Sequence, residues 1–422
     1  MAPGGLSMFA LDCHPMNDTL RFPEGFLFGA SISAYQTEGN NTNTDWWWWE
    51  HKEGTPCVEP SGDACDFYHR YADDVAMLAG FGLDAFRFGI EWSRIEPAEG
   101  EFSKAALDHY RRMLAACHEH EVTPILTFHH FTLPLWLHEL GGFVAPRFPE
   151  RFARYCERAA AALGDLIGYA CTINEPQGLG LSGYVLGINP PGVKGDHDAA
   201  RRAADNLLEA HRLSAPVVRA HTAAPVGVCL AIPDLQYEDG ALPKDSGFEI
   251  ESHINDEFFT LARADDFIGV QTYTRIRIGP EGPRSPGSDW SGVSRELVET
   301  EHTTQMGYEF YPRALGGAIR RAWAGTGGIP ILVTENGVAT LRDERRIEYM
   351  RVALGEVQSC LAEGMDVRGY VHWSLLDNFE WAFGYGPRFG LVEVDRSTFA
   401  RTPKPSAHWL GGVARNRTLV SP

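Results

Sequence analysis

The amino-acid sequence predicts an α/β fold, a single (β/α)8 TIM barrel. Short runs of β-branched and aromatic residues alternate with longer segments of helical periodicity, which is the pattern of repeated βα units. Eight such runs separated by helical intervals favour a closed parallel barrel over an open sheet. The chain has 422 residues, of which 44% are hydrophobic, enough for one large core. We therefore expect one domain over residues 1–422, with residues 1–20 as an N-terminal extension.

The expected strands follow one another at intervals that leave room for a helix. They are residues 26–33, 85–92, 123–130, 169–175, 226–232, 267–273, 330–336 and 367–375. Apolar stripes of helical spacing predict helices over 105–120, 199–222 and 344–363, and we expect these stripes to pack on the barrel. In the first of them the apolar face is formed by Leu107, Tyr110, Leu114 and Cys117. A Gly/Pro/Ser-rich stretch at 279–292 is expected as a long loop after the sixth strand, not as a domain boundary.

The charge balance argues against two classes of partner. The chain carries 56 acidic and 37 basic residues, a formal net charge of −19. Such a field repels phosphate backbones and anionic lipid, so we expect no nucleic-acid partner and no membrane partner. The N-terminus lacks a basic region followed by an apolar run, and no uncharged stretch reaches the roughly 18 residues of a membrane span. We expect a cytoplasmic protein that acts on a small molecule; assembly into a homo-oligomer stays open.

The cysteines do not form a recognisable framework. The chain has eight of them, with no CxxC pair and no Cys/His ligand cluster. In a chain of this size that distribution is typical of scattered reduced thiols. Cys57 and Cys65 stand close in the sequence, and both a chance proximity and a disulfide remain open for them.

Polar and aromatic residues gather where the expected strands end. The set is Gln36, Arg87, His129, His130, Asn174, Glu175, Tyr273, Glu335, Asn336 and Trp373. The carboxyl ends of the strands form the face of a (β/α)8 barrel on which active sites are built. The sequence therefore predicts a site on this face.

Two glutamates in this set suggest glycoside hydrolysis. Glu175 closes the fourth strand and Glu335 closes the seventh, so each carboxylate is held at the barrel mouth by a rigid strand. Glycoside hydrolysis needs such a pair, one to protonate the leaving oxygen and one to attack or to activate water. Arg87 lies within an apolar strand, and a buried guanidinium needs an anionic partner. That partner is either a structural carboxylate or the attacking glutamate, which a nearby cation would keep ionised.

Six motifs in order give the sequence a clear resemblance to glycoside hydrolase family 1, the β-glucosidase and β-galactosidase family. They extend from about residue 21 to 410 and are FLFGASISAYQTEG (26–39), FRFGIEWSRI (86–95), NEP (174–176), MGYEFYP (306–312), TENG (334–337) and WSLLDNFEW (373–381). The resemblance implies a retaining β-glycosidase that hydrolyses unphosphorylated β-glycosides or short oligosaccharides by double displacement, without a cofactor.

The resemblance also implies roles for individual residues. Glu175 matches the family's general acid/base and Glu335 its nucleophile. Asn174 matches the residue that binds the sugar 2-hydroxyl, and Arg87 and Tyr273 match the pair that flanks the nucleophile. The other substrate-binding residues implied are Gln36, His130, Trp373, Glu380, Trp381 and Phe389.

Three features depart from the family pattern. Phe131 replaces the usual tryptophan after His130, which removes an indole donor, and Gln271-Thr272-Tyr273 replaces Asn-Tyr-Tyr. The chain is also short for the family. The first two bear on the sugar preference and the third on the aglycone preference.

Two clusters have both a structural and a functional interpretation. The four tryptophans 46–49, in the loop after the first strand, cannot all face one way, so some pack structurally while one or two could line the entrance. His129-His130 looks like a metal-binding pair, but no further ligand has suitable spacing, so we expect no metal.

Other functions stay open at this stage. Transglycosylation uses the same chemistry with an acceptor alcohol. A catalytically dead sugar-binding barrel would lack one catalytic glutamate, and in a thioglucosidase the acid/base position is usually not Glu. A different barrel enzyme would have to share the 373–381 motif by coincidence.

Overall fold

Eight parallel strands close into a barrel in the computed structural model, which describes residues 20–239, 249–283 and 299–419. Around the barrel the order is β2 (Leu27–Ser31), β3 (Ala85–Gly89), β4 (Thr123–His129), β5 (Tyr169–Asn174), β6 (Val226–Ala231), β8 (Phe267–Gln271), β11 (Ile331–Asn336) and β12 (Val367–Trp373). The last strand pairs with the first, Tyr370 opposite Phe28. The predicted (β/α)8 fold is confirmed, and each predicted strand agrees with an observed one to within three residues at either end.

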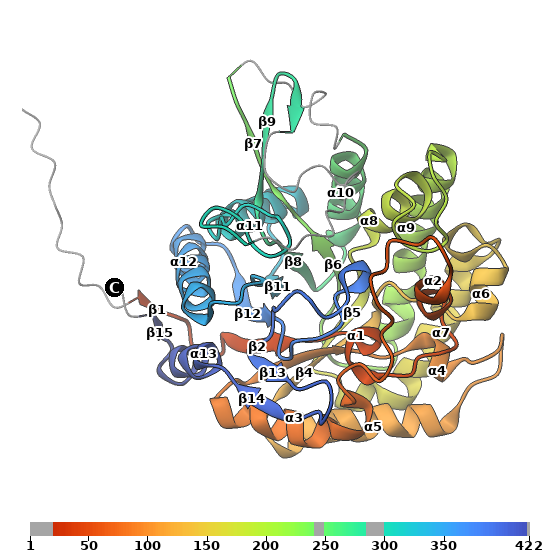
Figure 1. Cartoon of the computed structure of the whole chain (residues 1–422), viewed down its shortest axis with the longest axis horizontal. Helices are drawn as coiled ribbons and strands as arrows, with labels where there is room; N and C mark the ends of the chain where they lie inside the picture. The colour runs from red at the N-terminus through yellow and green to blue at the C-terminus, as the bar shows by residue number, and fades with distance from the viewer. Residues whose placement is uncertain (1–19, 240–248, 284–298, 420–422) are drawn as a thin grey trace, which may run out of the picture.

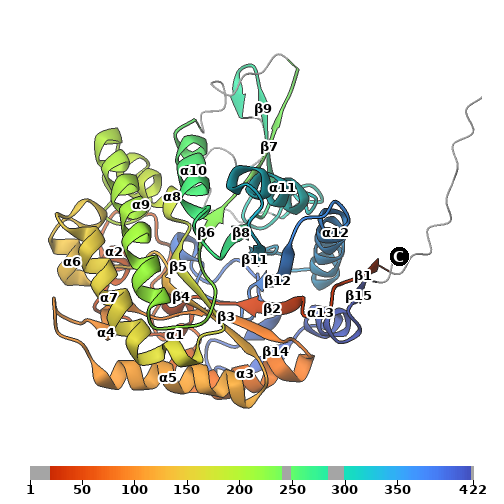
Figure 2. The same ribbon diagram turned by 180° about the vertical axis from the view of Figure 1, so that it is seen from behind.

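Helices surround the barrel as an outer layer (Figures 1 and 2). The longer ones are α3 (Phe67–Phe81), α5 (Lys104–Glu119), α7 (Phe148–Leu163), α9 (His197–Arg219), α10 (Glu249–Ala262), α11 (Ala314–Thr326), α12 (Asp343–Ala362) and α13 (Pro405–Asn416). The three predicted helices are α5, α9 and α12. On α5 the predicted face is buried at Tyr110, Leu114 and Cys117, while Leu107 is partly exposed. The stripe thus packs inward because its residues recur every three or four positions.

The barrel interior is filled by apolar side chains, one each from seven of the eight strands. They are Ala85, Ile125, Cys171, Cys229, Phe267, Leu332 and Val371. This layer closes the barrel from below, so the side chains that follow it on the strands stand on a packed floor.

Smaller elements decorate the barrel ends. A three-stranded sheet of β7 (Asp234–Tyr237), β9 (Arg275–Gly279) and β10 (Gly282–Pro283) projects from the loops after β6 and β8, at the top of Figure 1. β1 (Leu20–Arg21) pairs with β15 (Thr418–Leu419), and β13 (Val392–Val394) pairs with β14 (Arg401–Pro403). Among the described residues, no helix is long and apolar enough to cross a membrane.

Some sequence-based expectations need correction or fall outside the description. The expected loop 279–292 begins instead with a hairpin, in which Gly282 pairs with Gly279 at a φ of 109° that favours glycine. Residues 284–292 and 1–19 lie outside the described part of the chain. The loop assignment for the four tryptophans is wrong, since they lie in a short helix, α2 (Asp45–His51), capped by the Thr44 hydroxyl.

Candidate active site

The predicted site residues come from different strands but meet at one barrel mouth. Arg87 lies on β3, Asn174 ends β5, Glu335 lies near the end of β11 and Trp373 ends β12. The pairing register shifts beside Asn174 in β5 and beside Glu335 in β11. Such irregularities re-aim side chains at the rim of a barrel. The structure thus brings together residues that are far apart in the sequence, such as Arg87 and Glu335, which are separated by 248 positions.

Glu335 is held by donors on both carboxylate oxygens. Arg87 Nη1 donates to Oε1 at 2.5 Å, and the Tyr273 hydroxyl donates to Oε2 at 2.5 Å. Burial raises the pKa of Glu335 above its ordinary value, while the charge of Arg87 and the hydrogen bonds from Tyr273 and Arg87 oppose that rise. Of the two partners left open for Arg87, the observed one is therefore Glu335.

A closed circuit of hydrogen bonds surrounds Glu335. Arg87 Nη2 donates to Asn174 Oδ1 at 2.5 Å. Gln271 Nε2 donates both to Asn174 Oδ1, at 2.8 Å, and to Glu335 Oε1, at 3.0 Å. All four side chains are buried, so water does not compete for these contacts. Because both donors meet Asn174 at its oxygen, its amide nitrogen is turned to His130 Nε2, 3.3 Å away.

Glu175 stands at the end of β5 with a left-handed backbone, φ 45°. Pro176 begins α8 (Pro176–Gly180) directly after it, and the Glu175 backbone N–H donates to the Cys229 carbonyl at 2.9 Å. Its side chain is half-buried. Burial first, and then the charges of Glu335 and Glu175, raise the pKa of Tyr273 far above its usual value, so both carboxyl groups act on the same phenol.

One wall of the pocket combines a carboxyl group with amide and indole groups. Gln36 Nε2 lies 3.4 Å from Glu380 Oε2 and donates to the Phe379 carbonyl at 2.8 Å. Desolvation and the charge of Glu335 raise the pKa of Glu380 to about 8. At neutral pH Glu380 is therefore largely the neutral acid.

The aromatic residues of the pocket stack on one another. The His130 ring lies nearly parallel to Trp373 and to Trp381, with centroids 5.8 and 6.1 Å away. Burial and the charge of Arg87 hold the pKa of His130 well below its usual range, so the imidazole is neutral. Phe131 packs against Trp381 at 5.2 Å. Phe131, Glu175 and Trp381 all have positive φ, and such conformations cluster at functional sites.

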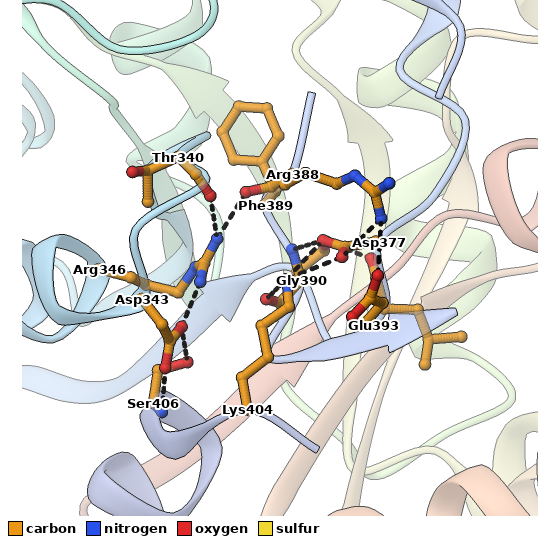
Figure 3. Close-up of polar contacts among 12 residues, drawn as sticks. Thr340, Asp343, Arg346, Asp377, Arg388, Phe389, Gly390, Glu393, Lys404 and Ser406 are labelled. Atoms are coloured by element: carbon orange, nitrogen blue, oxygen red, sulfur yellow. Dashed lines mark hydrogen bonds and ion pairs between the residues drawn. The ribbon is translucent and has the colours of Figure 1, made fainter. Parts of the chain in front are cut away.

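Phe389 is fixed by a polar network behind the pocket (Figure 3). Its ring meets Tyr273 edge-on, at 5.8 Å. The adjoining Gly390 N–H donates to Asp377 at 2.8 Å, and Lys404 Nζ donates to both oxygens of Asp377, at 2.9 and 2.7 Å. Arg346 donates to the Arg388 carbonyl at 2.6 Å. The buried carboxylate of Asp377 thus joins its own segment, which continues to Glu380, to the segment that carries Phe389 and Gly390.

Some residues singled out from the sequence lie outside the pocket. The His129 ring packs edge-on against Phe143 and Phe152, and burial lowers its pKa to about 3. Asn336 donates to the Thr272 carbonyl at 2.7 Å and accepts from Tyr370 at 3.0 Å, so it ties β11 to its neighbours. Neighbouring residues on a strand point to opposite sides, which separates His129 from His130 and Asn336 from Glu335.

The four tryptophans divide as helix geometry requires. Trp46 and Trp49, three positions apart, are buried, and Trp46 contacts the pocket residue Trp381 at 4.4 Å. Trp47 and Trp48 are half-buried; Trp47 stacks on His51, and Trp48 on His138. The cluster therefore supports the wall of the pocket from behind.

Sequence reasoning missed three residues of the site. Gln271 was noted only as a departure from the family pattern. Met306 packs with Trp373, Phe389 and Tyr273. The pKa of Tyr308 is raised by burial and by the charges of Glu380 and Glu175. The motif at 306–312 was the available signal, but it does not say which of its side chains faces the pocket.

The described cysteines are free thiols. They include Cys57 and Cys65, and Cys65 donates to the Asp377 carbonyl at 3.3 Å. Within residues 20–239, 249–283 and 299–419, no three His, Cys, Asp or Glu side chains are grouped in a way that could hold a metal ion.

A closed parallel barrel whose mouth combines carboxyl groups, hydrogen-bond donors and indole rings defines a (β/α)8 glycoside hydrolase. Residues 18–262 and 249–419 match the sequence profile of glycosyl hydrolase family 1, to which the chain belongs. It is a retaining β-glycosidase.

Known relatives match over nearly their whole length. The thermostable beta-glucosidase B of Thermobispora bispora is 33% identical over 95% of this chain and 92% of its own. The bifunctional beta-D-glucosidase/beta-D-fucosidase of Bifidobacterium breve is 32% identical over 93% and 97%. Among solved structures, the beta-glycosidase BGL167 has a TM-score of 0.83 and 45% identity, covering 95% of this chain and 99% of its own.

Proposed function

We propose that Glu335 is the nucleophile and Glu175 the general acid/base of this β-glycosidase. The observation that carries the proposal is the contact of Glu335 with Arg87 and Tyr273, each at 2.5 Å and on different oxygens. An attacking carboxylate must be ionised and aimed, and a cation with a fixed hydroxyl supplies both conditions. Glu175, half-buried at the end of a neighbouring strand, has the access to solvent that a proton donor and acceptor needs.

The reaction then proceeds by double displacement. Glu335 attacks the anomeric carbon and forms a glycosyl ester, while Glu175 donates its proton to the leaving oxygen. In the second step Glu175 takes a proton from water, whose oxygen attacks the anomeric carbon and releases Glu335. An acceptor alcohol in place of water would give transglycosylation by the same route. Such an enzyme has its carboxyl groups about 5–5.5 Å apart.

The sugar that fits best is an unphosphorylated hexose. Asn174 and His130 would bind the hydroxyls nearest the nucleophile, and Gln36, Glu380 and Trp381 the hydroxyls at the far side of the ring, over Trp373. Glu380 offers no positive charge, whereas a 6-phosphate needs cations as well as donors. The relatives named for glucosidase and fucosidase activity support β-glucosides as substrates, with β-galactosides or β-fucosides also accepted.

The reduced state of the cysteines supports a cytoplasmic location. Seven of the eight lie in the described residues, and all seven are free thiols. Reduced thiols persist in compartments that glutathione and thioredoxin keep reducing.

Covalent trapping tests the assignment directly. A 2-deoxy-2-fluoro-β-glucoside with an activated leaving group should inactivate the enzyme, and mass spectrometry should find the fluorosugar on the peptide that contains Glu335. Glu335→Gln should stay unlabelled, whereas Glu175→Gln should still be labelled because the leaving group needs little proton assistance. A label on any other carboxylate would refute the proposal.

A further inference from the structure

Gln271 occupies a position that no motif assigned, at the end of β8 and directly opposite Glu335 in the pairing register of β11. Its side chain is fully buried. The amide nitrogen carries two hydrogens, and it has two acceptors in reach: Glu335 Oε1 at 3.0 Å and Asn174 Oδ1 at 2.8 Å. The Gln271 side chain therefore connects Asn174, on β5, to Glu335, on β11, two strands that are separated in the barrel by β6 and β8.

The orientation of this amide is fixed by chemistry. Rotating it by half a turn would bring its oxygen against a carboxylate oxygen and an amide oxygen, both of which can only accept. The Gln271 oxygen itself has no hydrogen-bond partner in the described residues, and the amide nevertheless keeps the orientation in which its nitrogen donates to Asn174 and Glu335. The two donated hydrogen bonds thus outweigh the unsatisfied acceptor.

We propose that Gln271 is a positioning residue that couples the nucleophile Glu335 to Asn174, the residue that binds the sugar 2-hydroxyl. This proposal rests on the function proposed above. By holding Asn174 Oδ1, Gln271 keeps the amide N–H of Asn174 turned into the pocket. By holding Glu335 Oε1, it sets the carboxylate at a fixed place relative to that N–H. Hydrogen bonds to the 2-hydroxyl strengthen in the transition state, so their geometry matters most for the chemical step.

Arg87 cannot perform this coupling alone. It also spans Glu335 and Asn174, through Nη1 and Nη2, each at 2.5 Å. However, Arg87 alone supplies one donor to Oδ1, and the Asn174 amide is otherwise held by the longer contact of its nitrogen with His130 Nε2, at 3.3 Å. The second donor, from Gln271, closes the circuit and fixes the amide plane.

The test compares two substrates that differ only in the 2-hydroxyl. Gln271→Met keeps the volume and removes both donated hydrogen bonds. We expect kcat/KM for an aryl β-glucoside to fall about tenfold to a hundredfold, and that for the 2-deoxy analogue much less. The ratio of the two values should fall about fivefold or more, mainly in kcat.

Tyr273→Phe is the matched control. It removes a donor from the other oxygen of Glu335, Oε2, and so should lower kcat/KM for both substrates by a similar factor. Gln271→Asn, which keeps the amide but is too short to span both acceptors, should fall between wild type and Gln271→Met. It also supplies the test if the methionine variant fails to fold.

Equal losses on the two substrates, or no loss on either, in the better folded of these variants would overturn the coupling role. The fluorosugar experiment on the wild type reports on the nucleophile independently. If it labels Glu335 while the substrate ratio stays constant, the proposed function stands and the role of Gln271 does not.

Discussion

Arg87 and Glu335 meet at 2.5 Å inside the barrel, where the arginine side chain is wholly buried and the glutamate side chain is 5% exposed. Taking two charges out of water is costly, and the pair stays only because each charge satisfies the other. The pKa of Glu335 is nevertheless raised, because burial outweighs the attraction of Arg87. Two opposing effects therefore act on the pKa of Glu335, burial raising it and the charge of Arg87 lowering it.

Replacing Arg87 should move the acidic limb of the pH profile. Activity needs Glu335 ionised, so kcat/KM falls as the pH drops through its pKa. Arg87→Met removes the cation that stabilises the carboxylate, so the pKa must rise further and the acidic limb must shift to higher pH. Arg87→Lys, which keeps the charge, should shift it less, although it loses one of two directed contacts. A limb that stays in place in Arg87→Met would show that another group controls it.

The two glutamates should fail in different ways. Glu335→Gly should abolish turnover of aryl β-glucosides, and azide should restore it with the α-glycosyl azide as product. Glu175→Ala should still form the covalent intermediate from substrates with good leaving groups, and azide should then give the β-product. Proton NMR distinguishes the two azides. The same product from both variants would contradict the division of roles.

Glu175 should control the basic limb of the profile. A glutamate with the ordinary pKa of about 4.3 would be largely ionised at neutral pH and could not donate a proton. We expect the neighbouring charge of Glu335 to raise the pKa of Glu175, so that activity falls as pH rises through it. Glu175→Gln should retain activity on substrates that need no acid assistance, and the pH profile of this remaining activity should lack the basic limb. Its persistence would assign the limb elsewhere.

Sugar binding should expel a proton from Glu380. Burial, followed by the charge of Glu335, raises the pKa of Glu380 to about 8, so it is largely protonated at pH 7. Two sugar hydroxyls that donate hydrogen bonds to Glu380 favour the carboxylate and lower its pKa. At a pH between the pKa of the free enzyme and that of the complex, sugar binding therefore releases a proton. Calorimetry of a thioglucoside in buffers of different ionisation enthalpy would measure the release, and Glu380→Gln should remove it.

Glu380→Ser should also lower activity on glucosides about tenfold more than on xylosides, which lack the 6-hydroxymethyl group.

The contact of Lys404 with Asp377 should stabilise the back of the pocket. Lys404→Met leaves Asp377 buried with Arg388, 3.4 Å away, as its one charged partner among the residues that the structure describes. We expect the free energy of unfolding to fall by roughly 3 kcal/mol. The double variant with Asp377→Asn should recover part of this loss, because no unpaired charge remains. Denaturant unfolding measures both, and additive losses would show that the two residues do not interact.

Several parts of the site could be predicted because they follow from strand order. The C-terminal ends of parallel strands share one face, so residues at the ends of the predicted strands had to converge there. Arg87, Asn174, Glu335 and Trp373 were identified in this way. The resemblance to family 1 added Glu380, Trp381 and Phe389, which lie beyond the ends of the strands, where no strand periodicity indicates the direction of a side chain.

Other features depend on distances that no linear pattern contains. The reach of Gln271 to Asn174 depends on the register shift in β5 and on how far a side chain extends across the barrel mouth. The pKa of Glu380 depends on how much water the closed pocket excludes.

By itself, the sequence determined the barrel and the face that carries the site, because alternation of strands and helices is a local property of the chain. The roles of the two glutamates are a prediction from the family motifs. Only the tertiary structure decided which donors share which oxygens around Glu335, that His129 packs outward while His130 faces the pocket, and that the tryptophans 46–49 support the wall from a helix. These are properties of contact, and hydrogen bonds and desolvation act over a few ångströms between residues that the sequence places hundreds of positions apart.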